Sequence, residues 1–217
     1  DFGEYAVTTI GERGQVRAET YSRAEADAAN LLSEPINGGS ATAFSSTQND
    51  AVAILTRVQQ LHLSNQGWIY ASAGPEIDPE SFGPASAEAD APSFGLELGD
   101  ATSTADAISH ASATGIATDG GPGQTTGDST IVNEESGNIH ALATAWAEAD
   151  GPANAFSYLN PIPGIAGATS TVHSTSTAVA TAIDIRIGES WLVNHGLLVV
   201  DAYANAEADA VADSVAW

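Results

Sequence analysis

Cysteine, lysine and methionine are all absent from this 217-residue chain, and its five basic residues are all arginines. Without cysteine there can be no disulfide, no thiolate-bound zinc and no cysteine nucleophile. The arginines are outnumbered by 28 acidic residues, which gives a formal net charge of −23. Because phosphate groups are bound by basic side chains, we expect neither nucleic acid nor an anionic membrane as a partner.

The absence of methionine indicates that Asp1 is not a translated start, so we expect a chain that has lost a leader. No apolar run is long enough to cross a bilayer, so no membrane span is expected. These features favour an extracellular protein, either secreted or part of a cell-surface fibre. Aromatic residues are also scarce, at 6%, and most apolar residues are alanines, which predicts a thin, closely packed core.

What the chain has instead is strict alternation of small residues with polar ones. Alanine stands at every even position from Ala202 to Ala212, the same phase runs through Val16–Ala28, and a third alternating run covers Ile139–Asp150. A period of two is typical of a strand with one dry face and one wet face. We therefore predict an all-β fold, an antiparallel jelly-roll-like β-sandwich with at most one short helix.

Two local signals refine this prediction. The apolar residues between Asp50 and Leu61 follow a 3.6-residue period, which predicts the one helix. The segment Glu135–Asn138 has the composition of a hairpin turn.

The tetrapeptide AEAD occurs four times, beginning at Ala24, Ala87, Ala147 and Ala206. The spacing of about sixty residues could reflect a decayed duplication, the return period of a Greek-key strand order, or chance in a biased composition. On a strand, the two carboxylates of each copy share a face and could bind calcium, which prefers oxygen ligands; the alternative is a solvated acidic face. The candidate calcium ligands are Glu25, Asp27, Glu88, Asp90, Glu148, Asp150, Glu207 and Asp209.

The N-terminal segment differs in charge from the rest of the chain. Residues 1–23 have a net charge of −1 and residues 24–217 a net charge of −22. A nearly neutral strand attached to an acidic body suits docking on an acidic surface. We therefore divide the chain into an N-terminal donor-strand segment, residues 1–28, and a β-sandwich body, residues 29–217. The expected polymer interface comprises Tyr5, Val7, Ile10, Val16, Arg17, Ala18, Thr20, Arg23 and Ala24.

The N-terminal β segment Asp1–Ala28, the small-residue strands and the lost leader together resemble a known class of proteins. The chain is similar to extracellular filament subunits assembled by donor-strand complementation, such as TasA-type biofilm fibre proteins and archaeal bundling pilins. The resemblance implies a homopolymer that grows head-to-tail when the N-terminal strand of one subunit enters the sandwich of the next.

No catalytic motif is present, so an enzyme is not expected. The alternative function is a monomeric secreted β-sandwich module for carbohydrate binding or adhesion. In that case Trp68, Trp146, Trp191 and Trp217 would stack on sugars. Rows of serine and threonine also make O-glycosylation a possible modification.

Overall fold

The architecture is that of a computed structural model, which describes residues 3–29, 39–74, 85–90, 93–95, 101–119, 128–157, 167–186 and 188–216. Strands account for most of these residues, and none of them is helical. The all-β prediction is therefore confirmed. The antiparallel jelly-roll prediction is wrong, because neighbouring strands are parallel in all four sheets.

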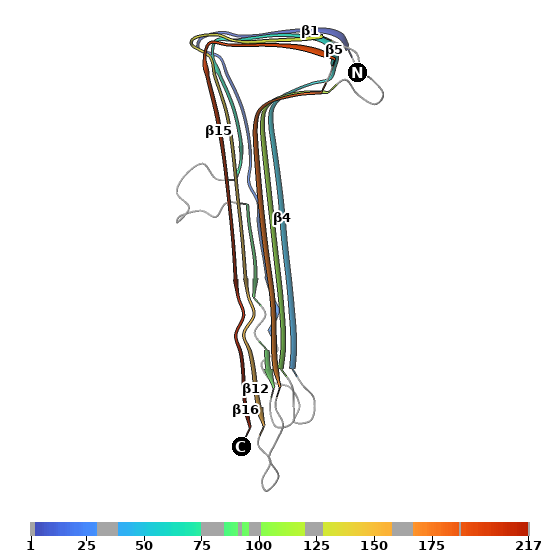
Figure 1. The fold of residues 1–217 in the computed structure, drawn as a ribbon, viewed down its shortest axis with the longest axis vertical. Helices are drawn as coiled ribbons and strands as arrows, with labels where there is room; N and C mark the ends of the chain where they lie inside the picture. The colour runs from blue at the N-terminus through green and yellow to red at the C-terminus, as the bar shows by residue number, and fades with distance from the viewer. Residues whose placement is uncertain are drawn as a thin grey trace.

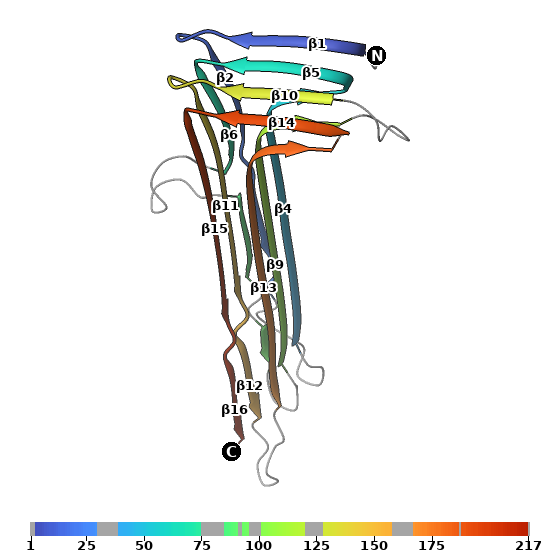
Figure 2. The same ribbon diagram turned by 45° about the horizontal axis from the view of Figure 1, so that its top comes forward.

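The chain forms a parallel β-solenoid, in which each circuit of the chain stacks on the one before it (Figures 1 and 2). We call each circuit a rung and each sheet by its place in the rung. The cross sheet at one end contains β1 (Gly3–Ile10), β5 (Val58–Asn65), β10 (Asp128–Asn133) and β14 (Glu189–Asn194).

Two long layers face each other below the cross sheet. The first layer contains β2 (Gln15–Thr20), β3 (Arg23–Asp27), β6 (Trp68–Ala73), β7 (Ala85–Asp90), β11 (Asn138–Asp150) and β15 (Leu197–Asp209). The second layer contains β4 (Gly39–Thr56), β9 (Ala101–Thr118) and β13 (Ala168–Ile185). The far end carries a short sheet of β8 (Ser93–Gly95), β12 (Ala153–Ser157) and β16 (Ala212–Ala216).

Alternation favoured an antiparallel sandwich because most parallel sheets are covered on both faces and read as continuous apolar runs. In this solenoid each long layer is covered on one face only, so its parallel strands keep the alternating pattern. The segment Glu135–Asn138, expected to be a hairpin turn, is instead a corner between β10 and β11, which lie in different sheets.

The core of the two long layers consists almost entirely of alanine. Ala105, Ala113, Ala143 and Ala147 are each fully buried, and they belong to clusters that bridge β9 and β11. Serine hydroxyls of one layer reach main-chain carbonyls of the other: Ser176 donates to the Ala145 carbonyl over 2.7 Å. The layers are thus separated by small side chains, which explains why most inward residues are alanine or serine; the exceptions include Thr47, Asn49 and Val172.

Among the described residues, a cluster of bulky apolar side chains lies where the two long layers meet the cross sheet. This cluster includes Leu63, Ile69, Ile116, Ile131 and Ile139, all of which are buried.

The helix predicted over Asp50–Leu61 is wrong. These residues form the end of β4 and the beginning of β5. The buried–exposed alternation of β4 breaks at Ala53 and Ile54, close to the corner where the chain turns into the cross sheet. This change of phase produced the helix-like spacing of apolar residues.

Candidate functional site

The four AEAD copies stack directly on one another. Ala24, Ala87, Ala147 and Ala206 occupy the same position in successive rungs. The repeat therefore marks the solenoid itself, rather than a Greek-key return or a chance similarity.

This stacking produces two columns of like charge along the first layer. One column contains Glu25, Glu88, Glu148 and Glu207; the other contains Asp27, Asp90, Asp150 and Asp209. The side chains of Glu88 and Asp90 lie outside the described residues, and the other six are exposed to solvent. Within the described part of the chain, no cluster of three or more metal-ligating side chains is found, and calcium binding stays a prediction.

The residues of the expected polymer interface all lie in the first rung but point in different directions. Tyr5 and Val7 are exposed on the outer face of β1, while Ile10 is buried. Val16, Ala18, Thr20 and Ala24 are half-buried and alternate with exposed residues on β2 and β3.

The two arginines of that set point outward. Arg17 pairs with Glu19 through a 2.6 Å hydrogen bond, and Arg23 lies 3.4 Å from Glu25. All three N-terminal strands pair with β5, β6 and β7 of the same chain.

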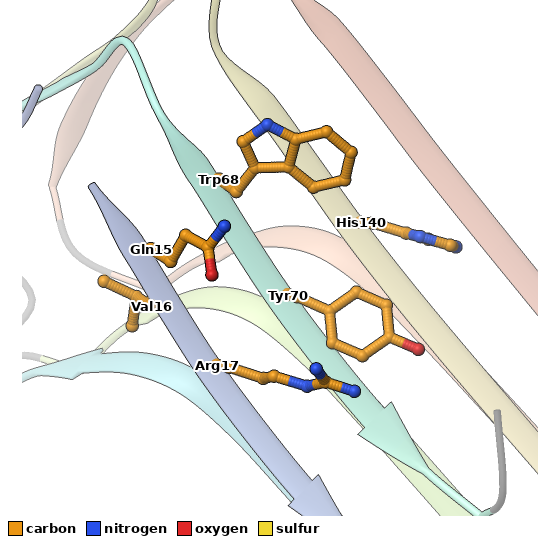
Figure 3. Close-up of a pocket in the computed structure, with 6 residues that line it drawn as sticks. All are labelled: Gln15, Val16, Arg17, Trp68, Tyr70 and His140. Carbon is orange, nitrogen blue, oxygen red and sulfur yellow. The ribbon is translucent and has the colours of Figure 1, made fainter. Parts of the chain in front are cut away.

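Within the described residues, a groove on the outer face of the first layer is a candidate binding site. It has a volume of about 250 Å³ and is lined by Gln15, Val16, Arg17, Trp68, Tyr70 and His140. Figure 3 shows that these side chains come from three neighbouring strands, β2, β6 and β11. The register places Gln15 beside Trp68, and Tyr70 between Arg17 and His140.

Tyr70 contacts two other side chains of the groove, Arg17 and His140. The Arg17 guanidinium lies 5.2 Å from the centre of the Tyr70 ring, a cation–π contact. The His140 ring meets the Tyr70 ring edge-on at a centroid distance of 5.2 Å. Trp68 is 51% exposed, so one indole face is available to a ligand.

The polar side chains Arg17 and His140 of the groove already have partners. The Arg17 guanidinium faces Glu19, and His140 Nε2 lies 3.3 Å from Asp201 Oδ2. A charged ligand would have to compete with these contacts, whereas a neutral ligand would not. The groove therefore presents aromatic rings beside polar side chains.

Three of the four tryptophans expected to stack on sugars can be located. Trp68 lies in the groove, Trp191 is exposed on β14, and Trp146 is half-buried on the outer face of β11. Trp217 lies outside the described residues.

A ladder of asparagines, not expected from the sequence, lies at the corner after the cross sheet. Asn65 and Asn133 are fully buried, and Asn65 Nδ2 donates to Asn133 Oδ1 over 2.8 Å. Asn133 Nδ2 in turn donates to Asn194 Oδ1 over 2.8 Å. Each of these asparagines ends a strand and is followed within four residues by glycine, a signal that was present in the sequence.

The glycines are required because successive corners touch. A Cβ on Gly137 would lie 2.2 Å from Asn133 Oδ1 and 2.5 Å from the Asn65 carbonyl oxygen. A Cβ on Gly67 would similarly lie 2.2 Å from the Gly14 carbonyl oxygen. At Gly67 and Gly137, a side chain larger than a hydrogen atom would displace the backbone of the preceding rung.

Comparison with known proteins identifies no relative: no family model, no curated protein and no solved structure matches the chain. In the described part of the chain, no helix is long and apolar enough to span a membrane. The fold and the site must therefore be interpreted from their own geometry.

Proposed function

We propose that this protein is a structural building block of an extracellular fibre, in which copies stack end to end through the open edges of their first and last rungs. The observation that carries this proposal is the set of strand edges, in the first and last of the described rungs, that have no neighbour among the described residues. Within the described residues, β1 and β2 have neighbours on one side only, as do β14 and β15. Such edges are templates for pairing with another chain.

The two ends match in shape because they are rungs of one repeat. Continuing the observed register would place Trp191 of one copy beside Val7 of the next, and Leu197 beside Gln15. Trp191 and Val7 are 71% and 58% exposed in the single chain. An aromatic residue beside a β-branched one is a favourable cross-strand pair. Such a contact joins different surfaces, so it propagates rather than closes.

In this proposal the N-terminal strands contribute to assembly through their free edge. The N-terminal strand of one copy would not insert into a β-sandwich of the next, because the described residues form no antiparallel sandwich that could receive it. The acidic columns would continue from copy to copy and make growth sensitive to salt.

The experiment compares filament formation by the unchanged chain and by two variants, using light scattering and negative-stain electron microscopy. Leu192→Arg places a charge on the inward side of β14, where the register aligns Leu192 with the buried Ile131. Glu189→Arg, the control, introduces the same residue at the exposed start of β14. We expect Leu192→Arg to abolish filaments and Glu189→Arg to permit them. An unchanged chain that stays monomeric in both low and high salt would contradict the proposal.

The groove supports a second candidate function, binding of neutral glycans. The exposed face of Trp68 would stack on the C–H face of a sugar ring, and the Gln15 amide could hydrogen-bond its hydroxyls. Titration with neutral hexasaccharides of glucose, mannose and galactose, followed by tryptophan fluorescence and calorimetry, tests this function. Trp68→Ala should abolish binding, whereas Trp191→Ala, which removes an exposed tryptophan outside the groove, should not. Equal loss in both variants would rule the groove out.

A further inference from the structure

The outer face of the second layer carries little charge. Its outward positions are the alternate residues of 40–52 on β4, 102–114 on β9 and 169–181 on β13. Most of them are threonine or serine, and Asp50 and Asp106 are the only acidic residues among them. The outer face of the first layer carries the acidic columns instead. Of the two long layers, the second is therefore the one on which another copy of this acidic chain can lie with the least repulsion.

Large apolar side chains also stand on this face. Phe44 of β4 is 59% exposed, Ile108 of β9 is 40% exposed and Val179 of β13 is 46% exposed. The three strands run straight and side by side (Figures 1 and 2), so the face can pack against a second flat sheet. Removing these side chains from water would favour such packing.

The titratable side chains of β9 lie symmetrically about Ile108. Asp106 occupies the outward position before Ile108, and His110 occupies the outward position after it. The register places Phe44 and His173 beside Asp106 in the neighbouring strands. A carboxylate and an imidazole therefore stand at equal distances on either side of the central apolar residue.

This pattern is its own complement when a second copy is rotated by a half turn about the direction in which the rungs stack. The rotation reverses the strands and leaves each rung opposite the same rung of the other copy. With the axis at Ile108, Asp106 of each copy faces His110 of the other, and an imidazole N–H can donate to a carboxylate. A half turn about the strand direction would instead place Asp106 opposite Asp106, which is unfavourable.

We infer that the outer face of the second layer binds the same face of a second copy, with the strands of the two copies antiparallel and Ile108 at the centre. The alternating segments extend about 43 Å and the three strands span about 14 Å, so each copy contributes about 600 Å². The total of about 1,200 Å² lies at the lower end of the range for specific interfaces. The apolar side chains provide the affinity, and the two pairs of Asp106 with His110 fix the orientation.

This dimer does not depend on end-to-end stacking, because every strand lies opposite its own counterpart. The number of rungs therefore does not change which residues face one another. In a fibre, the same contact would join two stacks side by side with their rungs level.

Cross-linking tests the position of the twofold axis, because the chain has no cysteine of its own. Ile108→Cys would bring two thiols face to face, within reach of a short bismaleimide. Thr102→Cys is the control on the same face and strand, since its two copies would be roughly 40 Å apart in the dimer. We expect Ile108→Cys to give cross-linked dimers at least tenfold faster than Thr102→Cys. Equal rates would overturn the inference.

Sedimentation of charge variants tests the pairing of Asp106 with His110. Asp106→Arg and His110→Glu should each weaken the dimer at least tenfold, because each places like charges opposite one another. The double variant restores opposite charges and should recover most of the affinity. Asp150→Arg makes the same change of charge on the first layer and should not weaken the dimer.

Each measurement is repeated in the Leu192→Arg chain, so that end-to-end stacking cannot contribute. The inference is overturned if the chain stays monomeric at submillimolar concentration in both backgrounds. It is also overturned if the double variant is as weak as the single ones. A dimer with these properties from a chain that never forms filaments would refute the fibre proposal and leave this face intact.

Discussion

Replacing Asn133 with alanine should destabilise the solenoid far more than the same change at Asn194. Asn133 is the middle member of the asparagine ladder and is fully buried. Its side chain accepts one 2.8 Å hydrogen bond from Asn65 and donates another to Asn194. Further contacts of its Nδ2 reach the Leu197 and Gly137 carbonyls over 3.3 and 3.4 Å.

The magnitude follows from these contacts. Losing two ladder bonds costs about 0.5–1.5 kcal/mol each, and a buried donor left without a good partner costs about 1–3 kcal/mol more. Asn65 Nδ2 would be that donor, since its remaining contact is the Asn138 carbonyl at 3.4 Å. For Asn133→Ala these contributions sum to about 2–6 kcal/mol of unfolding free energy, with a midpoint of about 4 kcal/mol. Asn194→Ala removes the acceptor of Asn133 Nδ2 and the 3.2 Å bond from Asn194 Nδ2 to the Gly196 carbonyl. Because Asn194 is exposed at the end of the ladder, water can replace both partners, and the change should cost only about 0.5–1.5 kcal/mol.

Equilibrium unfolding in urea measures both values, followed in parallel by circular dichroism and by tryptophan fluorescence. Coincident transitions are needed before a single free energy is assigned, because stacked repeats can unfold in stages. If Asn133→Ala lies within 1 kcal/mol of Asn194→Ala, on the order of one hydrogen bond, the ladder is not a stabilising network and the reasoning fails.

Three further changes test the packing and the charge columns. Gly137→Ala should lower the free energy of unfolding in urea by about 1–3 kcal/mol or more, because its Cβ would meet Asn133. The control Gly11→Ala, which has no atom within 4 Å of the added Cβ, should have little effect. Ala143→Leu should lower the melting temperature, because the larger side chain overpacks the space between the two layers. Ala202→Leu, at the same position in the last rung, should be tolerated because Ala202 is exposed. Equal effects of the two changes would contradict the close spacing of the layers. Asp150→Asn should raise the unfolding free energy by about 0.5–1 kcal/mol in low salt and leave it unchanged in 1 M NaCl, since it removes a charge from one column. Millimolar calcium should stabilise the unchanged chain more than NaCl of equal ionic strength does, and identical curves would argue for a plain solvated acidic face.

The strands could be predicted from the sequence because alternation survives in the folded chain. The direction of pairing could not, because the same period of two arises in any sheet with one covered face. The repeat was hidden by its loops: Gln15, Trp68 and Asn138 occupy one position in successive rungs, yet they are 53 and 70 residues apart. The groove was missed for a related reason. Arg17, Tyr70 and His140 come from three different rungs, so no contiguous sequence motif contains them.

The elongated cross-section has a mechanical consequence. The long layers contain strands of 18 residues, which extend roughly 60 Å, whereas packed sheets are usually about 10 Å apart and these two, with small side chains between them, lie no farther apart than that. Any stack of such rungs is a flat beam, whose resistance to bending in its wide plane exceeds that in its thin plane by the square of this ratio, on the order of thirtyfold. The cross sheet turns away from the long layers at one end, as Figure 2 shows, and stiffens that margin as a flange does. Such a beam would bend easily in its thin plane and resist bending in its wide plane.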